Sequence, residues 1–343
     1  MPSVDTSRPV VTPSGGSYTD PVAVTISHED SDVELRYTTS FYHHPTAESD
    51  LYDAPLEVRE KTYLRAQAYR DGEPVGEAVA AGFMFFDPAM MAAEYDWQPQ
   101  PEKAAMMIVF AHPDDEVVPF RGAIPLYGTV RKLPLVNICM SNREGVEKDQ
   151  MRRKEMEAAF HAYGLPNAPL YANFPDDCYG RPVTDCMNTW GMMETVSYVT
   201  EQVRRYKPDV ILTHDFYGEY GHPNHIVTAI ACFDAFKMAN DPGRFPEQVE
   251  SLGLWQPRKL YAHKAHHNSW IHDWDTPCPE LGGRTPQEVA QEGVSCHKSQ
   301  EAGFVDYQGH DFGLILSSVG PDVKTGDFFE NIDTTIYQTV PSS

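Results

Sequence analysis

Two short polar segments of the sequence carry the residue types of a metal site. The first, residues 112–116 (His-Pro-Asp-Asp-Glu), combines one imidazole with three carboxylates. The second, residues 220–225 (Tyr-Gly-His-Pro-Asn-His), holds His222 and His225 three positions apart. A catalytic zinc ion needs three nitrogen or oxygen ligands and an open position for water. Either segment alone is a weak signal, but together they supply a complete ligand set.

Each polar segment follows an apolar run that predicts a buried strand. Residues 105–110 lead directly into the first segment, and the run 208–213 lies shortly before the second. Such continuous runs are typical of parallel sheets, and chemistry in open α/β sheets collects at the carboxyl ends of the strands. Pro223 suits the first turn of a helix. We therefore expect both segments to meet at one edge of a parallel sheet.

Predicted strands and helices alternate from residue 103 onward. The further strands expected are 133–140, 169–174 and 258–263, and the helices expected are 147–163, 190–206 and 223–239. Alternation with short connections predicts an α/β fold with a Rossmann-like, mostly parallel sheet flanked by helices. The sequence contains no GxGxxG or GxxxxGKS/T motif, so it offers no glycine-rich loop of the kind that binds the phosphates of a nucleotide.

The N-terminal part of the chain predicts a small all-β sandwich over residues 1–88. Apolar residues alternate with polar or small ones at 22–26, 33–37 and 62–69, and Asp71-Gly72 supplies a hairpin turn. The proline-broken stretch 89–102 is expected to be a linker. Residues 103–343 are then expected to form the second domain.

Composition narrows the classes of partner. The formal net charge is −23, which argues against nucleic acid or an anionic membrane as a partner. No apolar run approaches the length of a membrane span. The six cysteines form no CxxC pair, so neither a structural zinc site nor a disulfide framework is expected.

The second domain resembles the PIG-L/LmbE family of zinc-dependent N-deacetylases. The resemblance rests on 112–116, Arg152-x-x-Glu155, residues 207–210 (Lys-Pro-Asp-Val) and 221–225. Residues 312–332 are similar to the family's C-terminal portion, so the likeness covers about 103 to 335. It implies a Rossmann-like fold, a Zn²⁺ cofactor and hydrolysis of N-acetyl groups, mostly on amino sugars.

The resemblance also implies roles for the two polar segments. His112, Asp115 and His225 would be the zinc ligands, and Asp114 would be the general base. His222 would stabilise the oxyanion or protonate the leaving amine. These roles agree with the chemistry, because zinc lowers the pKa of a water towards ~7. A carboxylate beside it can then take the proton, and the amine must be protonated to leave.

Three further positions match substrate-binding residues of the family: Arg152, Tyr220 and Asp176. The sequence departs from the family at Asn224, where His-Pro-Asp-His is usual. An amide can orient an imidazole but cannot stabilise an imidazolium by charge. We therefore expect a lower pKa for His222 than a carboxylate neighbour would give.

Other polar residues have more ordinary interpretations. Glu116 is expected to cap or pair at the start of the following helix. His214 and Asp215 could support the site from behind or make ordinary loop contacts. The remaining late histidines are interpreted as surface or structural residues: His263, His266, His267, His272 and His297.

The first domain resembles the C-terminal-type sandwich of chitobiases and hexosaminidases. The motifs are residues 13–18 (Pro-Ser-Gly-Gly-Ser-Tyr), 22–27, 35–39 and 64–68. Such modules accompany extracellular carbohydrate enzymes, which implies a sugar context, although a spacer that binds nothing fits as well. This context favours a secreted or cell-surface protein, with its signal peptide absent from this sequence, over a cytoplasmic one.

The sequence as a whole predicts a zinc-dependent carbohydrate N-deacetylase acting on an N-acetylated sugar or glycan. Two alternatives remain open. One is an amidase on a small molecule that is not a glycan, which would share the metal centre and differ in the pocket. The other is an inactive carbohydrate-binding or scaffold protein, against which the complete ligand set argues.

Overall fold

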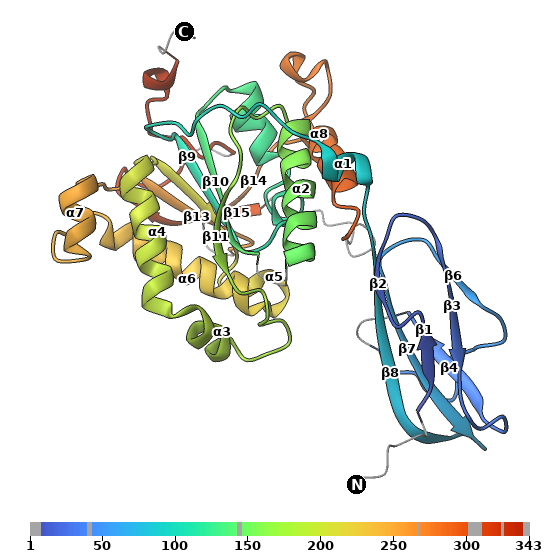
Figure 1. Cartoon of the computed structure of the whole chain (residues 1–343). Coiled ribbons are helices and arrows are strands. Elements are labelled where there is room, and N and C mark those ends of the chain that lie inside the picture. Colours follow the sequence, from blue (N-terminus) through green and yellow to red (C-terminus); the bar gives the residue numbers. More distant parts are fainter. Residues whose placement is uncertain are drawn as a thin grey trace. The chain divides into compact units, whose positions relative to one another are not determined.

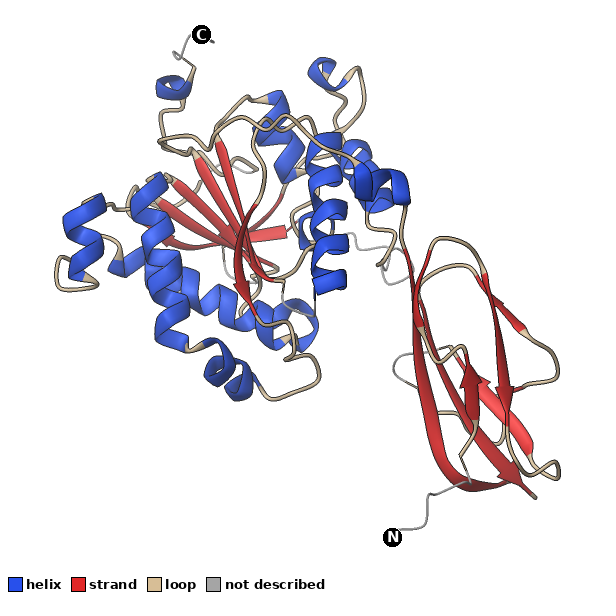
Figure 2. Ribbon diagram, viewed as in Figure 1, coloured by secondary structure: helices blue, strands red, loops and turns tan. Residues whose placement is uncertain are grey.

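The computed structural model describes residues 8–39, 43–142, 146–265, 268–300, 311–323 and 326–338. These residues form two compact units. The first runs to Ala92 and also includes residues from His297, and the second consists of Ala93–Cys296 with the residues from 311 onward. The first unit is built from strands and one short helix, α1 (Pro88–Ala92), whereas the second mixes strands and helices throughout (Figure 2).

The first unit contains two β-sheets that share one apolar core. One sheet has the order β1 (Val10–Thr12), β3 (Val22–Ser27), β6 (Leu56–Val58). The other has the order β2 (Gly16–Tyr18), β8 (Glu73–Phe85), β7 (Thr62–Arg70), β4 (Glu34–Thr38), β5 (Asp50–Leu51). All pairs are antiparallel except β2 with β8. The inward residues of both sheets, such as Ile26 and Leu64, meet in the core, as in a sandwich.

The second unit is organised around a seven-stranded sheet in the order β11, β10, β9, β12, β13, β15, β14 (Figure 1). The strands are β9 (Met106–Phe110), β10 (Leu135–Ser141), β11 (Leu170–Phe174), β12 (Val210–Thr213), β13 (Lys259–His263), β14 (Ser269–Ile271) and β15 (Asp311–Ser317). The first five strands in the order are parallel, and β15 and β14 add an antiparallel edge. The predicted Rossmann-like, mostly parallel sheet is therefore confirmed.

Helices flank this sheet. They are α2 (Val146–Ala162), α3 (Val183–Trp190), α4 (Met192–Tyr206), α5 (Gly218–Gly221), α6 (Pro223–Met238), α7 (Pro246–Leu252) and α8 (Pro286–Cys296). Short helical turns lie at Asp115–Val117, Pro125–Val130, Pro279–Leu281 and Thr335–Tyr337. Helix α4 packs on α6, and α2 packs on α8. None of the helices within the described ranges is long and apolar enough to cross a membrane.

The single helix expected over 190–206 is two helices. Gly191 separates α3 from α4 with a φ of 68°, and a Cβ there would lie 2.7 Å from the Glu194 carboxylate. The Trp190 indole donates a hydrogen bond to the Pro175 carbonyl and stacks on Phe174. These tertiary contacts fix the end of α3, and the helical period of the sequence does not report them.

The strand order places the site. The chain proceeds from β9 outward to β10 and β11, and then returns to the other side of β9 to form β12 and β13. This reversal creates a crevice beyond the carboxyl ends of β9 and β12, where open α/β sheets bind ligands. The two polar segments follow these two strands.

A buried arginine holds the end of helix α6. The Arg204 guanidinium is fully buried and donates to five backbone carbonyls and one side chain: Met238, Ala239, Asp241, Arg244, Phe245 and Gln248. Replacing Arg204 with alanine leaves these acceptors without their donor, and we expect a loss of about 3 kcal/mol in the free energy of unfolding. Urea unfolding checks this. Arg205→Ala, an exposed neighbour paired with Glu201, should change stability by less than about 0.5 kcal/mol.

Candidate metal centre

The turn after β9 is held by its own carboxylates. Asp114 has a φ of 126°, which is unusual for a residue with a side chain. The Asp114 backbone N–H donates to the Glu116 carboxylate at 2.9 Å, and the His112 N–H donates to Asp115 Oδ2 at 2.6 Å. Strained backbone of this kind concentrates at functional sites. Glu116 is fully buried and serves the turn.

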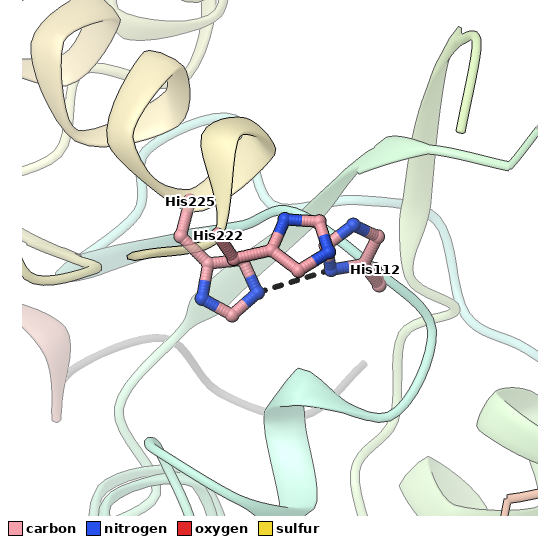
Figure 3. Close-up of side chains that lie close together, drawn as sticks. All are labelled: His112, His222 and His225. Atoms are coloured by element: carbon pink, nitrogen blue, oxygen red, sulfur yellow. Dashed lines mark hydrogen bonds between the residues drawn. The ribbon is translucent and has the colours of Figure 1, made fainter. Parts of the chain in front are cut away.

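Two imidazole nitrogens and one carboxylate from the two polar segments lie close together. His112 Nδ1 is 3.1 Å from His225 Nε2 (Figure 3). The two oxygens of Asp115 each face one of these nitrogens, with Oδ2 3.3 Å from His112 Nδ1 and Oδ1 3.3 Å from His225 Nε2. Ligand bonds of about 2.1 Å in a tetrahedral zinc site separate neighbouring ligand atoms by about 3.4 Å. All three residues are less than a tenth exposed. The triangle formed by these three side chains therefore has the size that a tetrahedral cation requires.

A second carboxylate lies behind each of the two imidazoles. His225 Nδ1 is 2.6 Å from Glu219 Oε2, and His112 Nε2 is 3.3 Å from Asp176 Oδ1. At His225, the carboxylate of Glu219 on the far nitrogen keeps the hydrogen there and leaves the near lone pair for a metal. The lone pairs facing one another across the triangle then repel unless a positive charge lies between them. The donor set thus fits a divalent cation.

The charges of the site agree with this interpretation. Burial opposes a charged imidazole, yet Asp176 and Asp115 raise the pKa of His112 to about 9. Against its own burial, Asp115 has a pKa held well below the usual range by the imidazoles of His225, His214 and His112. The carboxylate charge that favours a proton on these imidazoles also favours a metal cation, which would bind after that proton is released.

His214 lies beside the triangle but has its nitrogens engaged elsewhere. Two groups of side chains lie close enough to hold a metal: one is His112, His222 and His225, and the other is Asp115, His214 and His225. However, His214 Nε2 accepts the Ala111 backbone N–H at 2.9 Å, and its Nδ1 lies 3.1 Å from Glu219. The ring stacks on His225 at a centroid distance of 3.9 Å. His214 therefore supports the ligand His225 from behind.

His222 lies at the open side of the cluster. Its ring centroid is 4.4 Å from that of His112 and 4.7 Å from that of His225. Its Nδ1 accepts the Asn224 backbone N–H at the start of α6, which leaves Nε2 as the donor. Burial and the neighbouring imidazoles of His112 and His225 lower the pKa of His222 to about 2. The Asn224 side chain contacts Cys186, so its expected influence on His222 stays a prediction.

The predicted substrate-binding residues border the same cluster. Arg152, on α2, donates to the Pro113 carbonyl at 2.6 Å and lies 3.2 Å from Asp114 and 3.3 Å from Asp176. Tyr220 is 66% exposed, with its ring 5.7 Å from that of His222. The structure thus brings all eight candidate residues together. It places Arg152 and Asp176 against protein groups, and their contacts with substrate stay predictions.

Three residues near the cluster were missed by the sequence reasoning. Glu219 directly precedes the second polar segment and lies three positions before His222, so an acidic residue beside that segment was the available signal. His263 ends strand β13 and is fully buried, 3.0 Å from Glu219, so it belongs to the support of the site. Tyr179 is 39% exposed, with its ring 5.1 Å from that of His222. His266 and His267 lie outside the described residues, and both His272 and His297 are buried.

Comparison with known families matches both parts of the chain. Residues 107–236 match the PIG-L family, described as GlcNAc-PI de-N-acetylase, and residues 13–80 match the chitobiase/beta-hexosaminidase C-terminal domain.

Several curated proteins are similar over the PIG-L region. Mycothiol S-conjugate amidase of Streptomyces coelicolor is 27% identical over 186 residues, covering 47% of this chain and 60% of that protein. The 1D-myo-inositol 2-acetamido-2-deoxy-alpha-D-glucopyranoside deacetylase of Rhodococcus erythropolis is 30% identical, covering 46% and 59%. The probable N-acetylglucosaminyl-phosphatidylinositol de-N-acetylase of Schizosaccharomyces pombe is 27% identical, covering 38% and 49%. The chain thus spans about half to three fifths of these relatives.

Among solved structures, N,N'-diacetylchitobiose deacetylase from Pyrococcus horikoshii aligns with a TM-score of 0.45 and 20% identity. The alignment covers 64% of this chain and 77% of that chain.

Proposed function

The chain contains a PIG-L family domain and a chitobiase/hexosaminidase C-terminal-type domain, and from this premise we propose that it is a zinc-dependent carbohydrate N-deacetylase. The observation that carries the proposal is the triangle of His112, Asp115 and His225, whose ligand atoms lie 3.1 to 3.3 Å apart. The reaction is hydrolysis of an N-acetyl amide on an amino sugar or glycan, which gives a free amine and acetate.

His112, Asp115 and His225 would hold the zinc ion, which when bound lowers the pKa of a water and polarises the amide oxygen. Asp114 takes a proton from the attacking water, and Arg152, 3.2 Å away, orients its carboxylate. The His222 Nε2–H donates to the amide oxygen as negative charge develops there. The C–N bond then breaks as the nitrogen takes up the proton that Asp114 accepted from the water, which gives the free amine and acetate and returns Asp114 to its ionised form.

Zinc is the metal that this donor set favours. Two imidazole nitrogens and one carboxylate match the three-ligand pattern of catalytic zinc. Glu219 lies beside the far nitrogen of His225, and Asp176 lies beside the far nitrogen of His112. Magnesium and calcium prefer sites made of oxygen ligands. A zinc ion held by these three ligands would keep a fourth coordination position for water and substrate.

A different amide substrate is the second candidate. One relative is named an amidase of a mycothiol S-conjugate, and such an enzyme would share the metal centre. The sandwich domain, similar to modules of chitobiase and hexosaminidase, favours a glycan substrate. An inactive scaffold is disfavoured because the ligands, the base and their supporting carboxylates are all in place.

Acetate release tests the proposal directly. The protein is incubated with N-acetylglucosamine, its β-1,4-linked oligomers, N-acetylglucosaminyl inositol and a thiol–sugar conjugate, and acetate is measured. We expect release from at least one glycan, loss of release with a chelator, and recovery with Zn²⁺. Metal binding without acetate release from any glycan would overturn the glycan substrate. A free primary amine formed from the conjugate alone, measured on the same samples, would establish the second candidate.

Tyr179 is expected to contribute to substrate binding through its ring. Its exposed ring stands with Tyr220 around His222, where the apolar face of a sugar could stack. Tyr179→Ala should raise KM about 2- to 10-fold and leave kcat nearly unchanged, because an aromatic contact contributes about 0.5–1.5 kcal/mol. Tyr179→Phe, which keeps the ring, serves as the matched control in the same steady-state assay. An unchanged KM in the alanine variant would contradict the stacking role.

A further inference from the structure

The buried carboxylate of Glu219 joins three histidines from three separate elements. Its Oε2 lies 2.6 Å from His225 Nδ1 on α6, and its Oε1 lies 3.1 Å from His214 Nδ1 and 3.0 Å from His263 Nδ1. Oε1 also accepts the Asp215 backbone N–H at 3.0 Å. The carboxylate therefore connects the metal-facing helix to the ends of β12 and β13.

The backbone at Glu219 has an unusual conformation that aims this side chain inward. Its φ of 57° and ψ of −53° interrupt α5, and Gly218 and Gly221 nearby also have positive φ. A residue with a Cβ adopts such a conformation only where surrounding contacts impose it. The Glu219 side chain is 6% exposed, whereas the adjacent Tyr220 is 66% exposed. The Glu219 side chain is therefore buried against His225, whereas the Tyr220 side chain is exposed beside His222.

We propose that Glu219 is the positioning residue of the metal centre, which fixes the tautomer and the orientation of His225. When the Nδ1–H of His225 donates to Glu219, Nε2 carries the lone pair. This lone pair points at His112 and Asp115. The negative charge behind the ring also makes Nε2 a stronger donor to a cation. This inference rests on the proposed function only in that a metal ion occupies the triangle.

The fully buried His214 and His263 hold the carboxylate itself in place. Both direct Nδ1 at the same oxygen, Oε1, so Oε2 is left to His225. Loss of the charge at Glu219 should therefore act on the metal through His225, whereas a change at His263 should act on the packing around Oε1. This difference separates a positioning role from a merely structural one.

Glu219→Gln is the test, with His263→Asn as the matched control. The amide introduced by Glu219→Gln has nearly the same shape as the carboxylate but can present NH₂ to His225, which favours the tautomer whose hydrogen faces the triangle. We expect the zinc dissociation constant, measured by competition with a chromophoric chelator, to rise about 10- to 100-fold. The d–d absorption of the Co²⁺-loaded protein should change as well. In His263→Asn, which keeps an N–H donor near Oε1, zinc affinity should stay within about threefold of the wild type.

Thermal unfolding of the metal-free proteins controls for stability. If Glu219→Gln fails to fold, Glu219→Asp keeps the charge but shortens the reach, and its zinc affinity should fall below those of the wild type and of His263→Asn. A zinc affinity of Glu219→Gln (or of the Asp variant in its place) within about twofold of the wild type would overturn the inference. An equal loss in His263→Asn would also overturn it. A wild-type protein that binds no metal would overturn the proposed function as well, so the two failures are distinguishable.

Discussion

Replacing His225 with alanine is expected to remove the bound metal and to lower acetate release by about 10³-fold or more. His225 supplies one corner of a triangle with only three protein ligands, and the remaining His112 and Asp115 would hold a cation weakly. A metal that acts as a Lewis acid contributes several kcal/mol to the transition state, and each 1.36 kcal/mol is tenfold in rate. Metal content after dialysis, measured by atomic emission, and kcat for acetate release check this.

The control for this variant is His161→Ala. His161 lies in the last turn of α2, where it stacks on Tyr95, and it is exposed. It should keep both metal and activity at the wild-type level. Circular dichroism shows whether His225→Ala remains folded, because its Glu219 contact is lost together with the metal. A folded His225→Ala protein that retains one zinc ion per chain would exclude His225 from the ligand set.

The parallel part of the sheet could be predicted because of its burial. Strands β9 and β10 are buried at every position, so the sequence shows them as unbroken apolar runs with polar residues where they end. The expected strand 105–110 differs from β9 by a single residue. Because catalytic loops of such sheets lie at the carboxyl ends, strand detection and site detection supported each other.

The antiparallel edge was not predicted. Strand β15 (Asp311–Ser317) pairs with β13 on one side and with the three-residue β14 on the other. A strand as short as β14 is stabilised by its partner, so the local sequence carries little signal for it. The break at Gly191 has the same origin, since the contacts of Trp190 with Pro175 and Phe174 decide it.

The proximity of His112, Asp115, His222 and His225 could be predicted from spacing, but the residues that contact them from behind could not. His112 and Asp115 are three positions apart, and so are His222 and His225, which makes each pair visible as a motif. Glu219 and His263 meet across 44 positions and share no motif. Contacts of this kind depend on the return of the chain through β13, which only the folded structure reveals.

The electrostatic surroundings of Arg152 change how its role is understood. The family resemblance implies that Arg152 and Asp176 bind substrate. In the structure, Arg152 joins Asp114 to Asp176, and Asp176 faces His112. The proposed base, Asp114, and the proposed ligand His112 are thus linked through Arg152 and Asp176, so substitution of Arg152 should disturb catalysis even for a substrate that it never touches.

Changing Asp114 to asparagine is expected to lower kcat about 10²- to 10⁴-fold while zinc stays bound, because general base catalysis contributes about this much. Asparagine has nearly the same shape, keeps an oxygen near Arg152, and is one of the residues most often found at positive φ, so the turn at φ 126° should persist. The carboxamide cannot take a proton from water at neutral pH. The two active-site variants then have different signatures, since His225→Ala loses metal and rate together and Asp114→Asn loses rate alone.

Asp185→Asn is the matched control for the base, because Asp185 is an exposed carboxylate on α3 paired with Arg181 at 3.4 Å. Its kcat should equal that of the wild type. Steady-state acetate release with metal content measured on the same samples decides the outcome. An Asp114→Asn protein that keeps its zinc and more than a tenth of the wild-type kcat would show that another group takes the proton.

Glu116 is not available for this role, because its carboxylate is buried and accepts the Asp114 N–H. Within residues 112–116, Asp114 is therefore the carboxylate expected to act as the base, because Asp115 is a proposed ligand and Glu116 holds the turn.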